Sequence, residues 1–391
     1  MIMKPAMLGG EPIFKETLRL NRPPTKSFMD EILERMKQPL STAMVTNFEN
    51  VQKLEKVIAG YIGRKNCVTT SSGSIGMSLA LKALGIKGDV LVPAFTFSAT
   101  AHAVSWCGLN IIPVDCYKDT FNMSVEDFEN KITENTECVM PVHVFGNPCN
   151  IDEIEAVARK HGIKVVYDSA HGFGAEYKGK KIGNFGTAEI FSGTPTKTFS
   201  TVEGGMIMTD DDNFAEILRK IRNYGADHNG DCEIPGMSAR MTELNAVVGL
   251  VLFEHFEEGK ERREEIVAKY KNGLKNLPGI TFQKITADSA SAHKDFAIVV
   301  GEEFGMTRDQ LHEALDKENI TTRKYFYPAI HQLTCYKDMR NYNLPNAEFL
   351  SQSVLCLPIF NEITDEEIDK VIEAVVNIHE HASEIRGVCS G

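Results

Sequence analysis

An aspartate ends one strand-like run of this chain, and a lysine follows the next such run. Asp168 closes the run Lys164–Asp168, and Lys197 comes soon after the run Glu189–Ser192. A carboxylate and a primary amine placed in this way suit pyridoxal 5′-phosphate (PLP). That cofactor needs an amine that bonds its aldehyde carbon and an anion that keeps its ring nitrogen protonated. The pair therefore predicts a PLP site, in which Lys197 also acts as the base that moves a proton during the reaction.

Asp168 and Lys197 also have simpler interpretations, which the neighbouring residues help to judge. A lone lysine is usually a solvated surface amine, but the segment Ser192-Gly-Thr-Pro-Thr-Lys197-Thr-Phe199 holds no other charged residue. We therefore expect partial burial, which lowers the pKa of the Lys197 amine. An aspartate at a strand end often only caps a turn. His171, three residues after Asp168, is then a surface histidine; in a PLP site it hydrogen-bonds the ring hydroxyl or orients the aspartate.

A turn of small residues, Thr69–Gly76, follows one strand-like run and opens a helix. The first N–H groups of a helix lack partners within it and lie at the positive end of its dipole, where a phosphate binds well. Gly73 permits close approach, the Ser74 hydroxyl adds a donor, and Ser192 offers a second hydroxyl. Taken alone, the turn is better explained as a serine-capped helix, so the phosphate assignment depends on the aspartate and the lysine.

Two phenylalanines follow the run Asp89–Pro93. An aromatic ring at this position can lie flat on the cofactor ring, with a stacking benefit on the order of 1 kcal/mol. Phe97 is the better candidate for this role. Phe95, two residues away, is expected to point elsewhere or to pack in the core.

These residues need a framework of strands and helices. Short apolar runs without polar alternation are separated by helix-like segments, as expected for strands that are covered on both faces. The pattern predicts an α/β domain with a mostly parallel sheet, which binds ligands beyond the carboxyl ends of its strands. The predicted strands are Cys67–Thr70, Asp89–Pro93, Ile111–Asp115, Cys138–Val142, Lys164–Asp168, Glu189–Ser192 and Met206–Thr209.

The rest of the chain is predicted to form a second, smaller domain. A charged helical stretch over residues 250–274 links the two. Thr307-Arg-Asp-Gln310 and Thr364-Asp-Glu-Glu367 each match the capping box that begins a helix. We assign residues 1–255 to an N-terminal segment and the large PLP-binding domain, and residues 256–391 to a small C-terminal domain.

The composition of the chain indicates which classes of binding partner it lacks the features for. The chain has 391 residues and a net charge of −12, so it lacks the basic surface typical of proteins that bind nucleic acid or anionic membranes. No apolar run approaches the roughly 18 residues of a membrane span, and residues 1–10 do not resemble a signal peptide. The nine cysteines are scattered and show no metal-ligand spacing. These features predict reduced thiols, no metal site and a cytoplasmic location.

In order and spacing, the motifs together resemble the DegT/DnrJ/EryC1/StrS family of PLP-dependent aminotransferases, which act on sugars and cyclitols. The resemblance extends over nearly the whole chain. It is carried by Leu8-Gly-Gly-Glu-Pro12, Thr46-Asn47, Ser72-Gly-Ser74, Leu91–Thr100, Asp168-Ser-Ala-His171, Phe191–Lys197, Glu203-Gly-Gly205, Gly236–Glu243, Arg323–Pro328 with His331, and Leu357-Pro358.

The resemblance implies the aspartate aminotransferase-like fold (PLP-dependent transferase fold type I), with a large domain, a smaller α/β C-terminal domain and an active site at a homodimer interface. Some relatives carry histidine at the lysine position and dehydrate sugars, so the lysine of this chain implies amino transfer. The implied contacts to the cofactor are Gly73, Ser74 and Ser192 to the phosphate, Phe97 to the ring face, Asp168 to the ring nitrogen, His171 beside the ring hydroxyl, and Lys197 to the aldehyde carbon.

One position departs from the family pattern. The family usually has asparagine where this chain has Ser238, and that asparagine reaches the phosphate from the partner subunit. Serine is shorter but can still donate, directly or through a water molecule. Arg240 is retained and can meet an anionic part of the substrate. Tyr325 and His331 lie in the family's substrate-side segment and are candidate substrate contacts.

The reaction implied by the resemblance moves an amino group from glutamate or glutamine to a keto sugar, foremost a nucleotide-linked 3-keto or 4-keto deoxysugar. A cyclitol aminotransferase that uses an inosose and a ring-forming synthase of the aminobenzoate type are alternatives of the same class. A PLP-sensing regulatory protein without turnover is an alternative of a different class. The intact Lys197 and the lack of a basic patch argue against that last alternative.

Overall fold

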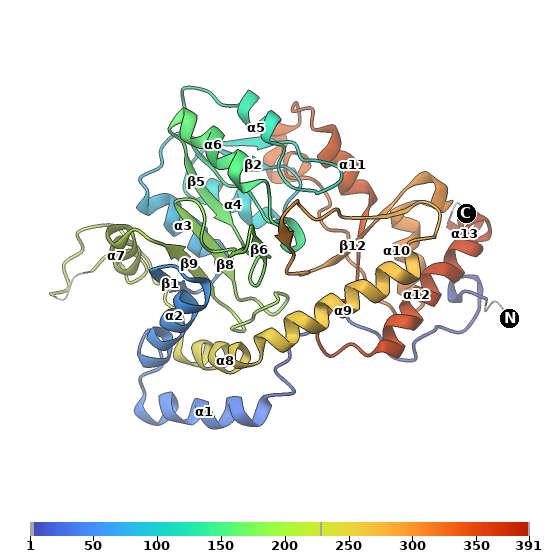
Figure 1. Cartoon of the computed structure of the whole chain (residues 1–391), viewed down its shortest axis with the longest axis horizontal. Coiled ribbons are helices and arrows are strands. Elements are labelled where there is room, and N and C mark those ends of the chain that lie inside the picture. Colours follow the sequence, from blue (N-terminus) through green and yellow to red (C-terminus); the bar gives the residue numbers. More distant parts are fainter. Residues whose placement is uncertain (1–3, 227–228, 390–391) are drawn as a thin grey trace.

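Seven strands of the larger lobe form one sheet in the order β1-β9-β8-β5-β4-β2-β3 (Figure 1). The computed structural model describes residues 4–226 and 229–389. Neighbouring strands from β3 to β8 are parallel, and β9 is antiparallel to both β1 and β8. The predicted mostly parallel, mixed sheet is therefore confirmed. Its strands are β1 Asn66–Thr70, β2 Asp89–Pro93, β3 Ile111–Val114, β4 Thr136–Val139, β5 Lys164–Asp168, β8 Ala188–Ser192 and β9 Gly205–Thr209.

Helices cover both faces of this sheet. Consecutive strand residues belong to different hydrophobic clusters: Cys67 contributes to one cluster and Val68 to the other. Helices α3, α4 and α7 pack in the cluster of Val68, whereas α2, α6 and α8 pack in the cluster of Cys67 (Figure 1). Burial on both faces is the physical reason for the apolar, unalternating strand sequences.

The helices vary widely in length. Those of the larger lobe are α1 Met29–Thr42, α2 Glu49–Ile62, α3 Gly73–Ala83, α4 Ser98–Trp106, α5 Val125–Asn130, α6 Ile151–His161, α7 Asp212–Ile221 and α8 Glu243–Glu254. The later helices are α9 Phe256–Leu274, α10 Arg308–Lys317, α11 Pro345–Ser353, α12 Asp365–Glu380 and α13 Ala382–Cys389. The predicted charged helical stretch is thus two helices, α8 and α9, which meet at His255.

The smaller lobe is built on the antiparallel sheet β10-β12-β13, formed by Ile280–Phe282, Phe296–Val300 and Val354–Leu357. Helix α9 runs from the end of α8 into this lobe and packs on α12 (Figure 1). A third, small sheet is formed by β6 Glu176–Tyr177, β7 Lys180–Lys181 and β11 Ser289–Ala290.

The N-terminal segment packs against the smaller lobe. Leu18 belongs to the core of that lobe and pairs with Ile320 in a short parallel bridge. The predicted boundary between residues 255 and 256 falls where α8 meets α9 and stays a prediction. We propose that residues 4–18 belong with the smaller lobe.

Both predicted capping boxes are confirmed. The Thr307 side chain accepts a hydrogen bond from the Gln310 N–H at 3.2 Å, and the Gln310 side chain accepts one from the Thr307 N–H at 2.9 Å. Thr364 and Glu367 make the same reciprocal pair at 3.1 and 2.8 Å. These caps satisfy backbone donors at the starts of α10 and α12.

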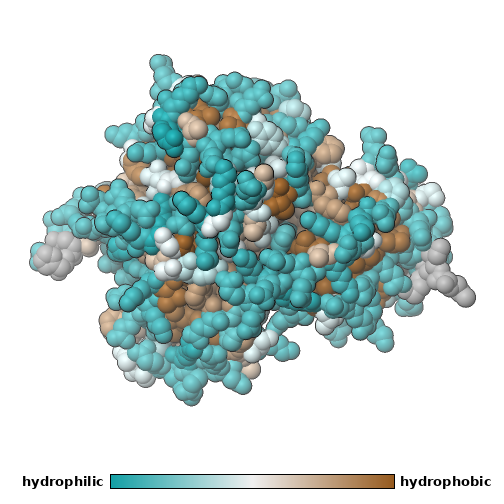
Figure 2. All heavy atoms as spheres, viewed as in Figure 1, coloured by the Kyte–Doolittle hydropathy of each residue, from teal (hydrophilic) through white to brown (hydrophobic). Residues whose placement is uncertain are grey.

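The surface of the described residues is largely hydrophilic on the face shown in Figure 2, with hydrophobic residues between the hydrophilic ones. Within residues 4–226 and 229–389, no helix has the length and apolar character needed to cross a membrane.

Candidate active site

A cavity of about 290 Å³ lies at the carboxyl ends of β5 and β8 and at the first turn of α3. Its position agrees with the rule that open α/β sheets bind ligands beyond the ends of their strands. The sheet brings together residues from distant parts of the sequence. The predicted site residues that line the cavity are Gly73, Ser74, Phe97, Asp168, His171, Ser192, Lys197 and Tyr325.

The first turn of α3 forms one wall of this cavity. Ser72 caps the helix, and its side chain accepts a hydrogen bond from the Ile75 N–H at 3.2 Å. Helix geometry leaves the N–H groups of Gly73 and Ser74 without partners inside the helix. A Cβ atom at residue 73 would lie 2.9 Å from the Cβ of Ser192, so only glycine fits where α3 approaches β8. This tight cradle of N–H groups and hydroxyls fits a phosphate.

Asp168 is a buried carboxylate, 5% exposed, that accepts hydrogen bonds from neutral donors. The Thr100 hydroxyl donates to its Oδ2 at 2.7 Å, and the Ala170 N–H donates to its Oδ1 at 3.0 Å. No salt bridge joins Asp168 to any residue that the structure describes. Because a buried carboxylate without a cationic partner is unfavourable, the site fits a ligand that presents a protonated ring nitrogen.

Thr100 is a contact that sequence reasoning missed. It lies in α4, which begins at Ser98, and its hydroxyl reaches the Asp168 carboxylate at the end of β5. A threonine in the first turn of a helix has no distinctive sequence signal, because the same residue type serves equally as an ordinary helix-start residue.

Lys197 lies in the loop after β8, where its backbone N–H donates to the Thr194 carbonyl at 3.0 Å. Burial of the amine and the nearby Lys294 lower the pKa of Lys197 from 10.5 to about 7, against the opposing effect of Asp168. The expected lowering of this pKa is confirmed. At neutral pH, a large share of the Lys197 amine is therefore uncharged and can attack a carbonyl carbon.

Lys294 lines the same cavity and was also missed by sequence reasoning. It is 2% exposed, and its ammonium donates to both oxygens of the Asp295 carboxylate at 2.9 and 2.8 Å. The ammonium also lies 5.1 Å from the centre of the Tyr325 ring. In the sequence, Lys294 and Asp295 directly before an apolar strand resemble an ordinary exposed strand end. Only the fold shows that Lys294 lines the same cavity as Lys197.

His171 is held as a neutral imidazole. Burial and the positive charges of Lys197 and Lys294 keep the pKa of His171 well below its usual range. Its Nδ1 accepts a hydrogen bond from the Phe145 N–H at 3.2 Å. In the neutral ring the proton therefore sits on Nε2, which gives the cavity a hydrogen-bond donor. The ring is stacked at 6.0 Å on Phe326, another wall of the cavity.

The two phenylalanines after β2 have different environments, as expected. Phe97 lines the cavity and is 50% exposed, which leaves one face of its ring available. Phe95 is fully buried among Phe121, Phe145 and Phe326.

Three predicted contacts lie outside the cavity of this single chain. Ser238 is exposed and accepts a hydrogen bond from Arg240 at 3.2 Å, and the Arg240 guanidinium lies 5.4 Å from the centre of the Tyr224 ring. His331 is 1% exposed, with its Nε2 atom 3.1 Å from Oε1 of Glu348. The roles of Ser238, Arg240 and His331 stay predictions.

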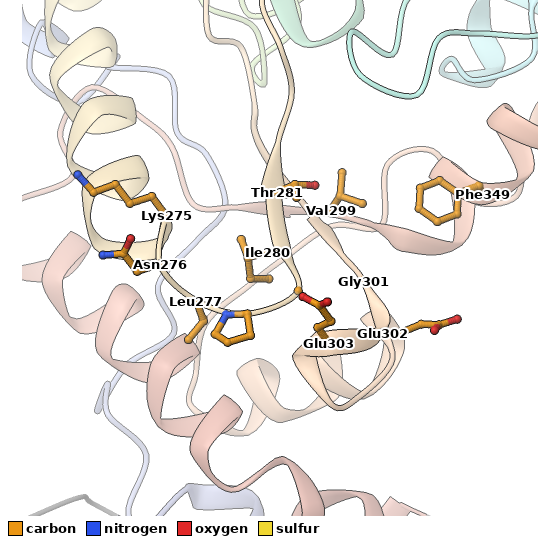
Figure 3. Close-up of a pocket in the computed structure, with 12 residues that line it drawn as sticks. Lys275, Asn276, Leu277, Ile280, Thr281, Val299, Gly301, Glu302, Glu303 and Phe349 are labelled. Carbon is orange, nitrogen blue, oxygen red and sulfur yellow. The ribbon is translucent and has the colours of Figure 1, made fainter.

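A larger depression, of about 620 Å³, lies in the smaller lobe beside the end of α9 (Figure 3). Lys275, Ile280, Glu303 and Phe349 are among the residues around it. No predicted site residue lines it. Size alone therefore does not identify the functional cavity, whereas the buried Asp168 and the perturbed Lys197 amine do.

Comparisons with known proteins agree with this geometry. The DegT/DnrJ/EryC1/StrS aminotransferase family matches residues 26–376. The chain is 34% identical over 331 residues to the dTDP-4-amino-4,6-dideoxy-D-glucose transaminase of Escherichia coli, a match that covers 83% of this chain and 89% of the relative.

Two solved structures share the fold. DesI, solved in the presence of its TDP-sugar product, matches with a TM-score of 0.91 and 31% identity over 98% of both chains. The PLP form of the putative sugar aminotransferase Spr1654 from Streptococcus pneumoniae matches with a TM-score of 0.85 and 25% identity, covering 94% of this chain and 99% of that one.

Proposed function

The chain belongs to the DegT/DnrJ/EryC1/StrS aminotransferase family and is a sugar aminotransferase, and we propose that PLP is its cofactor, glutamate or glutamine its amino donor and a nucleotide-linked keto sugar its acceptor. One observation carries the proposal: Asp168, a buried carboxylate without a salt bridge among the described residues, and Lys197, an amine with a pKa of about 7, line one cavity. When bound, PLP supplies an aldehyde carbon that carries the amino group and a ring that withdraws electrons.

The residues of the cavity are suited to hold this cofactor. The N–H groups of Gly73 and Ser74 and the hydroxyl of Ser192 bind the phosphate. Phe97 covers one face of the ring. Asp168 pairs with the protonated ring nitrogen. The PLP form of Spr1654 supports the cofactor assignment by similarity.

Three further side chains serve proton transfer and orientation. The neutral amine of Lys197 takes the proton from Cα of the amino donor, because its lowered pKa makes it an effective base near pH 7. The Nε2–H of His171 donates to the ring hydroxyl of the cofactor. Thr100 fixes the orientation of the Asp168 carboxylate through its hydrogen bond to Oδ2.

The acceptor is proposed from the relatives. The Escherichia coli relative is named for a dTDP-linked 4-amino-4,6-dideoxy sugar, and DesI was solved with a TDP-sugar product. We therefore propose a nucleotide-linked 3-keto or 4-keto deoxysugar, bound beside Tyr325.

We also propose a homodimer in the cytoplasm. Helix α1 lies at the edge of the larger lobe (Figure 1), and its Met29, Leu33 and Leu40 side chains are 53%, 54% and 58% exposed. An apolar helix face of this kind is unfavourable in water and suits a subunit interface. In such a dimer, Ser238 and Arg240 complete the active site of the partner.

A spectroscopic experiment tests the cofactor assignment first. Purified apoprotein mixed with PLP should develop the visible absorption band of amine-bound PLP, and Lys197→Ala should lack this band until an external amine is added. A band of equal size in Lys197→Ala without added amine would show that Lys197 is not the attachment point.

Product analysis then tests the acceptor. The PLP-loaded enzyme is incubated with glutamate or glutamine and a panel of 3-keto and 4-keto nucleotide sugars and inososes, and products are identified by mass. We expect amination of a nucleotide sugar. Amination of an inosose alone would instead favour the cyclitol aminotransferase, and no amino transfer at all would favour the regulatory protein.

A further inference from the structure

A second cavity, of about 320 Å³, adjoins the cavity of Lys197. The two share the walls made by Thr96, Phe97, Tyr325 and Phe326. The first cavity, at about 290 Å³, lies near the lower limit of about 300–1,000 Å³ for small-molecule sites. A cavity of this size would be filled by the proposed cofactor and the reacting sugar ring, so any further part of the substrate would extend into a neighbouring space.

Arg323 is one of the residues that line this second cavity. Its backbone N–H and C=O pair with Cys356 at 3.1 and 2.8 Å, which fixes its position beside β13. The adjacent Thr322 is 3% exposed, whereas Arg323 is exposed, as expected for alternating side chains of an extended segment. Within the described residues, the Arg323 guanidinium has no hydrogen-bond or ion-pair partner.

Lys324 and His312 are the other basic side chains that line this cavity. The Lys324 ammonium lies 3.2 Å from Oδ1 of Asp309, and the same carboxylate binds Nε of Arg308 at 2.7 Å. His312 also lines the cavity, and burial together with the Lys324 charge lowers its pKa, so it is neutral at pH 7. The charged side chains that line the cavity are therefore Arg323 and Lys324, with no carboxylate among the lining residues, and Arg323 is the one of the two without a partner among the described residues.

We infer that Arg323 and the cavity around it form the subsite for the diphosphate of a nucleotide-linked sugar. The inference rests on the proposed function and adds a residue that recognises the substrate. A guanidinium presents a planar set of donors that matches phosphate oxygens in a bidentate arrangement. Because Arg323 is separated from Lys197 by the shared walls, it contacts the anionic arm of the substrate and takes no part in the chemistry at the sugar carbon.

A binding experiment tests the subsite without turnover. Isothermal titration of thymidine, uridine and guanosine diphosphates into the PLP-loaded protein identifies the diphosphate that binds, and the matching nucleoside serves as the uncharged probe. The variants are Arg323→Ala and Arg323→Lys, with Arg159→Ala as a control that changes the net charge equally at an exposed position on α6.

We expect Arg323→Ala to weaken diphosphate binding on the order of 10- to 100-fold, the size expected for a lost hydrogen-bonded charge contact. Arg323→Lys should lose less, and Arg159→Ala should bind as the wild type does. Nucleoside affinity should be the same in all four proteins. Equal diphosphate affinity in wild type and Arg323→Ala would overturn the inference, as would a wild type that binds none of the three diphosphates.

A kinetic experiment separates the diphosphate from the other anion in the reaction, the carboxylate of the amino donor. Arg323→Ala should raise KM for the keto nucleotide sugar on the order of 10- to 100-fold, with kcat and the half-reaction with glutamate unchanged. Loss confined to the glutamate half-reaction would assign Arg323 to the donor carboxylate and overturn the inference. A wild type that aminates no nucleotide sugar would instead reject the proposed function, while the titration still decides whether the subsite exists.

Discussion

The amine of Lys197 should react with acylating reagents at neutral pH, where an ordinary lysine hardly reacts. With its pKa at about 7 in place of 10.5, the uncharged fraction is about 9% at pH 6, about 50% at pH 7 and about 91% at pH 8. Its acylation rate should therefore rise about tenfold between pH 6 and pH 8 and then level off. An amine with the ordinary pKa rises about tenfold for each unit across this whole range.

Trace labelling of the apoprotein with acetic anhydride provides the assay. Each sample contains a lysine reference peptide, and the modification of Lys197 relative to that peptide is measured by mass spectrometry after digestion. Lys294→Met removes a neighbouring positive charge and should shift the profile to higher pH. A rate at Lys197 that still rises tenfold between pH 8 and pH 9 in the wild type would refute the reasoning.

The same shift predicts a pH-dependent stability. Because the folded-state pKa of Lys197 lies below the unfolded value, the folded apoprotein binds fewer protons between pH 7 and pH 10.5, and its free energy of unfolding rises with pH there. Below pH 7 the buried charge costs about 5 kcal/mol. Lys197→Met removes this cost, so its stability advantage over the wild type should fall from about 3 kcal/mol at pH 8 to about 1 kcal/mol at pH 10. Urea denaturation at both pH values measures the difference, and a constant advantage would contradict the lowered pKa.

The remaining predictions concern the cofactor cradle and a helix cap. Asp168→Asn should lower kcat/KM at least about 100-fold, because it removes the buried negative charge that pairs with the ring nitrogen of the cofactor. Thr100→Val keeps that charge and removes the 2.7 Å hydrogen bond to Asp168, together with weaker contacts to Thr96 and Phe97, so it should lose about tenfold; equal losses in steady-state assays would show that the charge of Asp168 does not contribute to catalysis. Gly73→Ala should weaken PLP binding, measured by fluorescence titration, because the new Cβ would lie 2.9 Å from the Ser192 Cβ. Unchanged affinity would show that α3 and β8 can move apart to accommodate the methyl group. Thr364→Ala should lower the free energy of unfolding by about 0.5–2 kcal/mol and leave the PLP absorption spectrum unchanged, and an altered spectrum would show that α12 acts on the site.

Local sequence determined the framework and the two central chemical groups. The apolar strands could be predicted because burial on both faces of a sheet leaves a pattern within each strand, and the helix starts at Thr307 and Thr364 could be predicted because a capping box lies within four residues. Asp168 and Lys197 could be singled out because they follow consecutive strand-like runs, and because the segment around Lys197 holds no other charged residue. All of these signals depend on neighbours in the chain.

Tertiary structure decided everything that depends on contacts between distant segments. Three features arise where separate elements meet: the hydrogen bond from Thr100 to Asp168, the second amine at Lys294 and the cavity lined by Arg323. No spacing of residues in the sequence predicts them. The sequence preferred Phe97 over Phe95 as the stacking residue, but only burial placed one ring in the cavity and the other in the core. The physical reason is that burial and electrostatic environment are properties of the folded chain, and they turn an ordinary lysine or threonine into part of a site.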